Sequence, residues 1–270
     1  MKTSQILRLA PIFIGMLSIL STTESTAQKL MAVSENLLHD GHKYEVKYKG
    51  ISTFPKYHFH HYNVASGKTG WMKSKYKSGF FSRMEEASSE YKGSYIFVSS
   101  KGDSAWVNFN RNADYKGLQS RGIVIETPAI DFGIGSAAEV LESKDNYTAV
   151  IETNGSENTW RLIVAQKAGS KIQSSFFGWL TDGDRRIDIK AVFDYQVPGK
   201  KGAVDLMMGG LIWHKGFEFF EDARSIGAVQ LGPSNKQMVI WLANDIDPFT
   251  EFIVSASSVG LLRDYMVTMD

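Results

Sequence analysis

The most constraining feature of the chain is a strict alternation of apolar and polar residues from Arg186 to Val197. In an extended strand, one face carries the apolar and aromatic side chains Ile187, Ile189, Ala191, Phe193, Tyr195 and Val197. The other face carries Arg186, Asp188, Lys190, Val192, Asp194 and Gln196. An apolar face opposite a charged face is typical of an antiparallel sheet with one side in water.

Turn signals divide the neighbouring sequence into further strands. Asn154-Gly155, Asp182-Gly183 and Pro198-Gly199 each separate two β-like segments. Glycine supplies the positive φ that tight reversals need, so these dipeptides favour hairpins. The pattern predicts a five-stranded meander from about residue 146 to 214. Further strands are expected at residues 94–100, 104–110, 236–243 and 250–257, and a C-terminal helix at residues 259–266.

These elements predict an all-β fold. No repeat, linker or low-complexity tract divides the chain after residue 28, so we expect a single all-β domain at residues 29–270. With 270 residues, 43% of them hydrophobic, the chain can build one substantial core. The leading prediction is an antiparallel two-sheet sandwich, lectin-like or jelly-roll, around the long meander. The alternative is an up-and-down β-barrel.

The first 28 residues have the layout of a secretory signal peptide. Lys2 and Arg8 precede a short apolar run at residues 9–20, and a small polar run with Ser25 and Ala27 follows. The apolar run is too short to span a bilayer. An exported chain without cysteine fits a bacterial envelope, so we expect a periplasmic, outer-membrane or extracellular protein.

Composition excludes several function classes. The chain has 30 Lys and Arg residues against 29 Asp and Glu residues, a formal net charge of +1. Without a basic surplus, a dedicated nucleic-acid binder is disfavoured. The absence of cysteine excludes disulfide scaffolds, thiolate zinc sites and cysteine nucleophiles. Membrane association is expected only if the fold is a barrel.

Histidines cluster in the segment from Tyr57 to Tyr62, which contains His58, His60 and His61. In a strand, His58 and His60 point to the same face and can bind a divalent metal such as zinc. Both are also candidates for catalysis, as a general base or as metal ligands. A complete metal site needs further ligands, for which the candidates are His39, His42, Glu45 and His214. The alternative is a strand edge with hydrogen-bonded imidazoles and no metal.

Aromatic residues in a polar loop indicate a binding surface for sugars. Trp71 lies in a glycine-containing polar stretch at residues 66–76. Sugar rings stack on aromatic planes while their hydroxyls need polar partners. Trp71, Tyr57 and Tyr62 are therefore candidate stacking residues, and Arg83 is a candidate polar contact.

Asp182 and Asp184 can supply oxygen ligands to calcium. The spaced acidic run of an EF-hand loop is missing, and an Asp-Gly hairpin turn explains Asp182 without a metal. Both interpretations stay open at this point.

Three functions follow from these patterns. The leading hypothesis is a secreted protein that recognises a poly- or oligosaccharide. The second is an enzyme that cleaves polysaccharide with the His58 and His60 cluster. The third is a lipid-carrying or outer-membrane β-barrel. A divalent metal, calcium or zinc, is the only cofactor that the sequence indicates.

Overall fold

The computed structural model describes seven stretches of the chain, and in them it shows one antiparallel sheet and two helices. The described stretches are residues 30–49, 54–78, 84–118, 139–167, 176–196, 215–232 and 238–269. The helices are α1 (Glu35–Asp40) and α3 (Pro248–Met269). The strands are β1 (Gly41–Glu45), β2 (Lys47–Lys49), β3 (Lys56–Phe59), β4 (Tyr62–Thr69), β5 (Lys73–Ser78), β6 (Met84–Ser99), β7 (Ser104–Leu118), β8 (Glu139–Thr153), β9 (Trp160–Lys167), β10 (Phe176–Thr181), β11 (Arg186–Val192), β12 (Gly216–Glu221), β13 (Arg224–Gln230) and β14 (Val239–Ala243).

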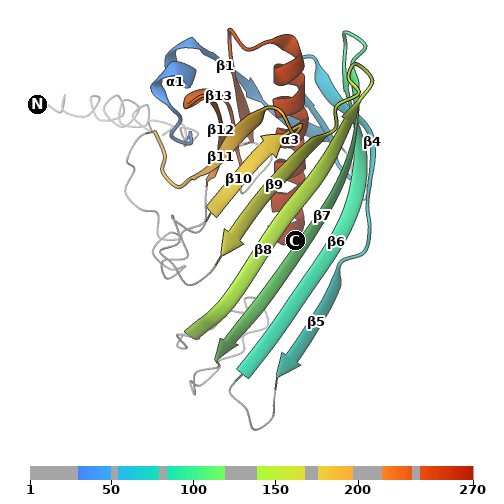
Figure 1. Cartoon of the computed structure of the whole chain (residues 1–270), viewed down its shortest axis with the longest axis vertical. Helices are drawn as coiled ribbons and strands as arrows, with labels where there is room; N and C mark the ends of the chain where they lie inside the picture. The colour runs from blue at the N-terminus through green and yellow to red at the C-terminus, as the bar shows by residue number, and fades with distance from the viewer. Residues whose placement is uncertain are drawn as a thin grey trace, which may run out of the picture.

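The sheet is strongly curved (Figure 1), and its strand order runs from β1 at one end to β2 at the other. Most neighbouring strands follow one another along the chain, as in an up-and-down meander. β1 pairs with β14 and β2 pairs with β3, and a single residue, Val46, separates β1 from β2. The Val46 N–H donates to the Met238 carbonyl at 3.0 Å. One short run of chain therefore joins both ends of the strand order and nearly closes a barrel.

The all-β prediction is confirmed, and the alternative architecture, the barrel, fits the structure. The two-sheet sandwich is not confirmed, because the described strands form a single sheet. Within the predicted meander, β8 to β11 are present, and their turns lie at Asn154-Gly155 and Asp182-Gly183. The expected fifth strand lies outside the described residues. β6, β7 and β14 confirm the predictions at residues 94–100, 104–110 and 236–243.

Helix α3 occupies the interior of the curved sheet (Figure 1). Every residue from 252 to 262 is buried, so this helix has no solvent face. The strand predicted at residues 250–257 is wrong, whereas the helix predicted at residues 259–266 is confirmed as part of α3. A continuous apolar run does not distinguish a buried strand from a buried helix by periodicity. In the described helices, no segment has the length and hydropathy needed to cross a membrane.

Small residues let α3 lie close to the sheet. A Cβ at Gly260 would come within 2.7 Å of the Tyr147 hydroxyl and 3.0 Å of the Tyr95 hydroxyl. The Tyr95 hydroxyl also donates to the Ala256 carbonyl at 2.7 Å. The core therefore consists of inward-facing aromatic and aliphatic strand residues packed directly against a helix backbone.

A partly buried charge cluster joins α3 to the long strands β6, β7 and β8. The Arg111 guanidinium on β7 donates to Asp145 on β8 through Nε at 2.8 Å, and to Asp264 on α3 through Nη1 at 3.0 Å. The Tyr91 hydroxyl donates to the same Asp264 carboxylate. Two carboxylates thus share one guanidinium. Burial raises the pKa of Asp264 to about 6, although Arg111 and Tyr91 lower it.

This cluster gives the unfolding free energy a distinct pH dependence. Between about pH 4 and pH 6, unfolding releases the Asp264 proton, because the unfolded carboxyl has a pKa near 3.9. Its contribution to stability is complete below pH 4 and is lost as the pH rises through 6. The stability advantage of the wild type over Asp264→Asn should therefore shrink by about 2 to 3 kcal/mol between pH 4 and pH 7. Urea denaturation at a series of pH values measures this difference, and parallel profiles for the two proteins would contradict it.

Candidate metal centre

His60 and His61 form the tight turn between β3 and β4. Phe59 and Tyr62 are paired across the hairpin, so the two histidines are its only loop residues. His60 has a φ of +48°, a backbone conformation that side chains other than glycine disfavour. The first residue of a two-residue hairpin of the II′ type takes a positive φ, and glycine is the usual choice there. Asp222 and Ala223 also have a positive φ, in the turn between β12 and β13, so this conformation is a property of the tight turn.

Glu251 in the first turn of α3 meets these two histidines. One ligand atom from each of His60, His61 and Glu251 lies within 4.8 Å of the others. His60 is exposed, and the other two residues are half-buried. Two imidazoles and one carboxylate are a ligand set that zinc and other divalent transition metals accept. Among the described residues, His60, His61 and Glu251 form the group of at least three histidine, aspartate or glutamate side chains whose ligand atoms lie close enough together to hold a metal ion.

Two tyrosines hold the cluster in place. The Tyr62 hydroxyl donates to Glu251 Oε1 at 2.9 Å, which leaves the second carboxylate oxygen available to an ion. The Tyr44 ring on β1 stacks on His60 at a centroid distance of 4.4 Å. Burial and the neighbouring Glu251 charge raise the pKa of both tyrosines, so their hydroxyls stay protonated. Partners of this kind orient metal ligands from the second coordination shell.

His61 is favoured in its neutral form. Burial lowers the pKa of His61, and the positive charges of His60 and Lys101 lower it further, against the opposing effects of Glu251 and Asp103. A neutral imidazole is the form that binds a metal. The surroundings of His61 therefore favour the neutral, metal-binding form of its imidazole at neutral pH.

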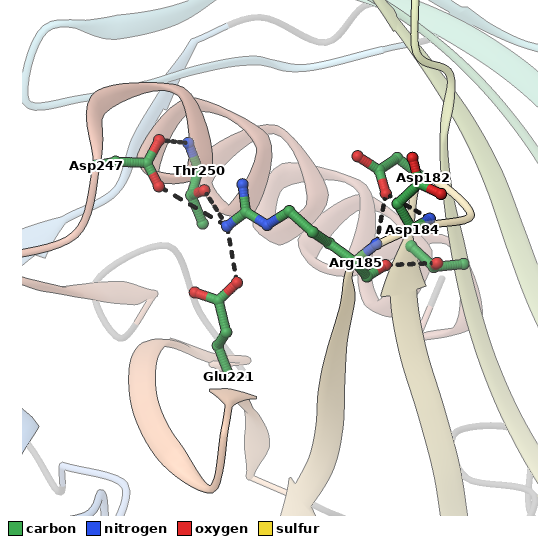
Figure 2. A network of polar contacts seen from close by, with 7 residues as sticks. Asp182, Asp184, Arg185, Glu221, Asp247 and Thr250 are labelled. Atoms are coloured by element: carbon green, nitrogen blue, oxygen red, sulfur yellow. Dashed lines mark hydrogen bonds and ion pairs between the residues drawn. The ribbon is translucent and has the colours of Figure 1, made fainter.

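Arg185 fixes the start of α3, and with it the position of Glu251. Its Nη2 donates to Glu221 at 2.7 Å and to the Thr250 hydroxyl at 2.9 Å (Figure 2). Asp247 begins the helix, because its Oδ1 accepts the Thr250 N–H at 2.9 Å. Burial raises the pKa of Asp247, but the Thr250 hydrogen bonds and the Arg185 charge outweigh this effect and the pKa is lowered overall. The helix start is therefore tied to two strand connections of the barrel.

Asp182 and Asp184 lie in the turn between β10 and β11, beside the same arginine (Figure 2). Asp182 Oδ1 accepts the N–H groups of Arg185 at 2.8 Å and Asp184 at 3.1 Å. The turn closes with Gly183 at a φ of +105°. These bonds account for Asp182 as a turn residue, and the structure does not group the two carboxylates with a third ligand among the described residues.

The structure separates the other candidate site residues. His58 is exposed on β3, and its Nδ1 lies 3.3 Å from the Tyr62 carbonyl oxygen, so it does not join His60. The strand ends at Phe59, which is why the expected same-face pair does not form. Tyr57 is 1% exposed and Tyr62 is buried, so both rings lie in the core. Trp71 is 95% exposed between β4 and β5. Arg83 lies outside the described residues.

Sequence reasoning identified His60 and did not identify Glu251 as its partner. Glu251 fell inside a segment interpreted as a strand, where it has no defined relation to the histidines. A usable signal was present in Asp247-Pro248, because aspartate at the N-cap followed by proline at the first helical position marks a helix start.

No family model matches this chain, and no curated protein or solved structure resembles it closely enough to count as a match.

The strained turn predicts an unusual order of substitutions. At His60, glycine relieves the positive φ and alanine does not, so His60→Gly should be more stable than His60→Ala by about 1 kcal/mol. At His58, which lies in a regular strand, the order should reverse, because glycine weakens a strand. Chemical denaturation of the four variants without added metal measures this. An alanine variant more stable than the glycine variant at both positions would show that the turn is not strained.

Proposed function

We propose that the protein binds one divalent transition-metal ion of the zinc class through His60, His61 and Glu251. The observation that carries this proposal is the approach of three ligand atoms to within 4.8 Å of one another, although Glu251 lies about 190 residues after the two histidines in the chain. The Tyr62 hydrogen bond to Glu251 and the stacking of Tyr44 on His60 support it, because both contacts hold ligand side chains around the same point.

Three protein ligands leave part of the coordination sphere of such an ion open. Zinc is usually four-coordinate, and catalytic sites keep the remaining position for water or substrate. His60 is exposed, so this position is accessible from solvent. A bound water in that position would be activated toward hydrolysis, which is the step that polysaccharide cleavage would need. This geometry supports His60 as the histidine that would serve the enzymatic hypothesis.

Metal titration tests the centre directly. Purified protein without a histidine tag should bind about one equivalent of Zn²⁺ or Co²⁺ by calorimetry. His61→Ala, His60→Ala and Glu251→Gln should each weaken binding by about ten-fold or more, because a three-ligand site loses one ligand. His58→Ala is the matched control on the same hairpin and should bind like the wild type. Equal losses in His58→Ala and His61→Ala would contradict the proposed ligand set.

We further propose that the protein recognises a glycan through Trp71. The observation that favours this second function is the 95% exposure of the Trp71 side chain, accompanied by exposed Met72. A large aromatic ring that gains no burial from the fold is free to stack on a sugar ring. Tyr57 and Tyr62 are not part of this site, because they belong to the core.

A second exposed tryptophan provides the control for Trp71. Trp71→Ala should weaken binding to any recognised glycan by about five-fold, since stacking on one aromatic ring contributes roughly 1 kcal/mol. Trp106→Ala, which removes a ring that is 56% exposed on β7, should leave the affinity unchanged. Glycan-array binding followed by calorimetry provides the measurement. If both variants, or neither, lost affinity, Trp71 would not be the stacking residue.

A further inference from the structure

Lysines crowd one part of the barrel surface, on strands β1 to β6. Nine exposed lysines lie on these strands, and this set is here called the basic face: Lys43, Lys47, Lys49, Lys56, Lys68, Lys73, Lys75, Lys77 and Lys92. Trp71 and Met72 lie in the short break between β4 and β5, inside this set.

Strand register places the nine side chains on the same, outer side of the sheet. On β3, Tyr57 and Phe59 point into the core, so Lys56 and His58 point outward. The cross-strand partners of Lys56 and His58 on β2 are Lys49 and Lys47.

The same alternation continues on the next strands. Lys68 on β4 is opposite Ser94 on β6, and Lys73 on β5 is opposite Glu90. Ser94, Lys92 and Glu90 alternate with the buried residues of β6, so they share its outer side. Lys75 and Lys77 follow Lys73 at two-residue steps along β5, which is about 7 Å per step.

Few acidic groups offset this charge. Among the side chains that the structure describes, the outer side of the same strands carries three glutamates, Glu45, Glu86 and Glu90. Lys92 binds Glu90 at 2.9 Å, and Lys73 and Lys75 also contribute to the lowered pKa of that carboxylate. The chain as a whole has a formal net charge of +1, so the remainder of the protein is net negative and the positive charge is concentrated here.

We infer that the basic face binds a linear anionic polysaccharide, one that carries carboxylate or sulfate groups, with Trp71 stacked on one of its sugar rings. This inference rests on the proposal that Trp71 recognises a glycan, and it names the chemical class of that glycan. Rows of ammonium groups match the repeated charges of such a chain, and the exposed ring supplies the contact that is specific for sugars.

The shape of the face favours a polysaccharide over a membrane. The outer side of a barrel is convex, so a flat anionic bilayer would touch only a strip of it, whereas a flexible chain can follow several strands. Among the described residues of these strands and of the break between β4 and β5, the exposed large hydrophobic side chains are Trp71, Met72 and Tyr76. Tyr76 alternates with Lys75 and Lys77 along β5, so it points to the opposite side from the lysines. This leaves little surface for insertion into a bilayer.

Binding to matched probes tests the inference. The purified protein should bind dextran sulfate and polygalacturonate at 100 mM NaCl, and bind uncharged dextran at least ten-fold more weakly. The affinity for the charged probes should fall as salt rises, because counterions are released on binding. A triple variant should bind the charged probes about ten-fold more weakly. It combines Lys73→Gln, Lys75→Gln and Lys77→Gln. A matched control variant should keep the wild-type affinity. It combines three substitutions on the rest of the barrel, Arg161→Gln, Lys144→Gln and Lys190→Gln. Trp71→Ala should also weaken the binding of both charged probes.

Four results would overturn the inference, and they separate it from the glycan proposal. Equal affinity for a neutral and a charged glycan, lost in Trp71→Ala but not in the lysine triple variant, would retain glycan recognition and reject the anionic class. Binding to no glycan on a broad array would reject both. Binding to phosphatidylglycerol vesicles but not to dextran sulfate would identify a membrane surface. Binding to single-stranded poly(dT) as tight as to polygalacturonate, and independent of Trp71, would identify a general polyanion surface.

Discussion

Burial of α3 inside the sheet is the interaction on which the rest of the structure depends. The helix is buried around its whole circumference from residue 252 to 262, so it cannot exist in water as a separate element. The strands in turn need an apolar partner for their inner faces, because a sheet with one apolar face must bury it. The closure at Val46 completes the enclosure by joining β14 to β3 through one run of chain.

The same arrangement assembles the candidate metal centre. The first turn of α3 emerges where the β3–β4 hairpin turns, and Glu251 therefore meets His60 and His61. Arg185 holds that turn of the helix to Glu221, so the position of the carboxylate depends on a contact outside the metal site. At the far part of α3, Arg111 binds Asp264 inside the barrel. Polar anchors near both ends thus fix the position of the helix, and its buried middle adds the hydrogen bond from the Tyr95 hydroxyl to the Ala256 carbonyl to its apolar packing.

The inside and the outside of the barrel serve different purposes. The inner face is occupied by core residues and by α3. In the described structure, the candidate binding residues therefore lie at one end of the barrel and on its outer surface. The candidate metal centre lies in the first of these regions, and the basic face with Trp71 lies in the second. Because the two proposed sites share no residue, substitutions can test each of them separately.

Much of the local structure could be predicted from the sequence, because strand periodicity and hairpin turns depend on neighbouring residues. The alternation at Arg186 to Val192 and the turn at Asp182-Gly183 are of this kind, and so is the exposure of Trp71. The choice between one sheet and two was not local, since it depends on β1 and β2 pairing with strands at opposite ends of the order.

The sequence by itself determined the all-β class, the hairpins and the candidate ligand His60. Only the tertiary structure decided that residues 250–257 form a helix, because burial on every side removes the periodicity that would reveal it. It also decided that Glu251, and not His58, completes the cluster, since a strand that ends at Phe59 directs His60 into a turn facing the helix start. The basic face has the same origin: lysines spread over 50 residues become one surface only when their strands pair.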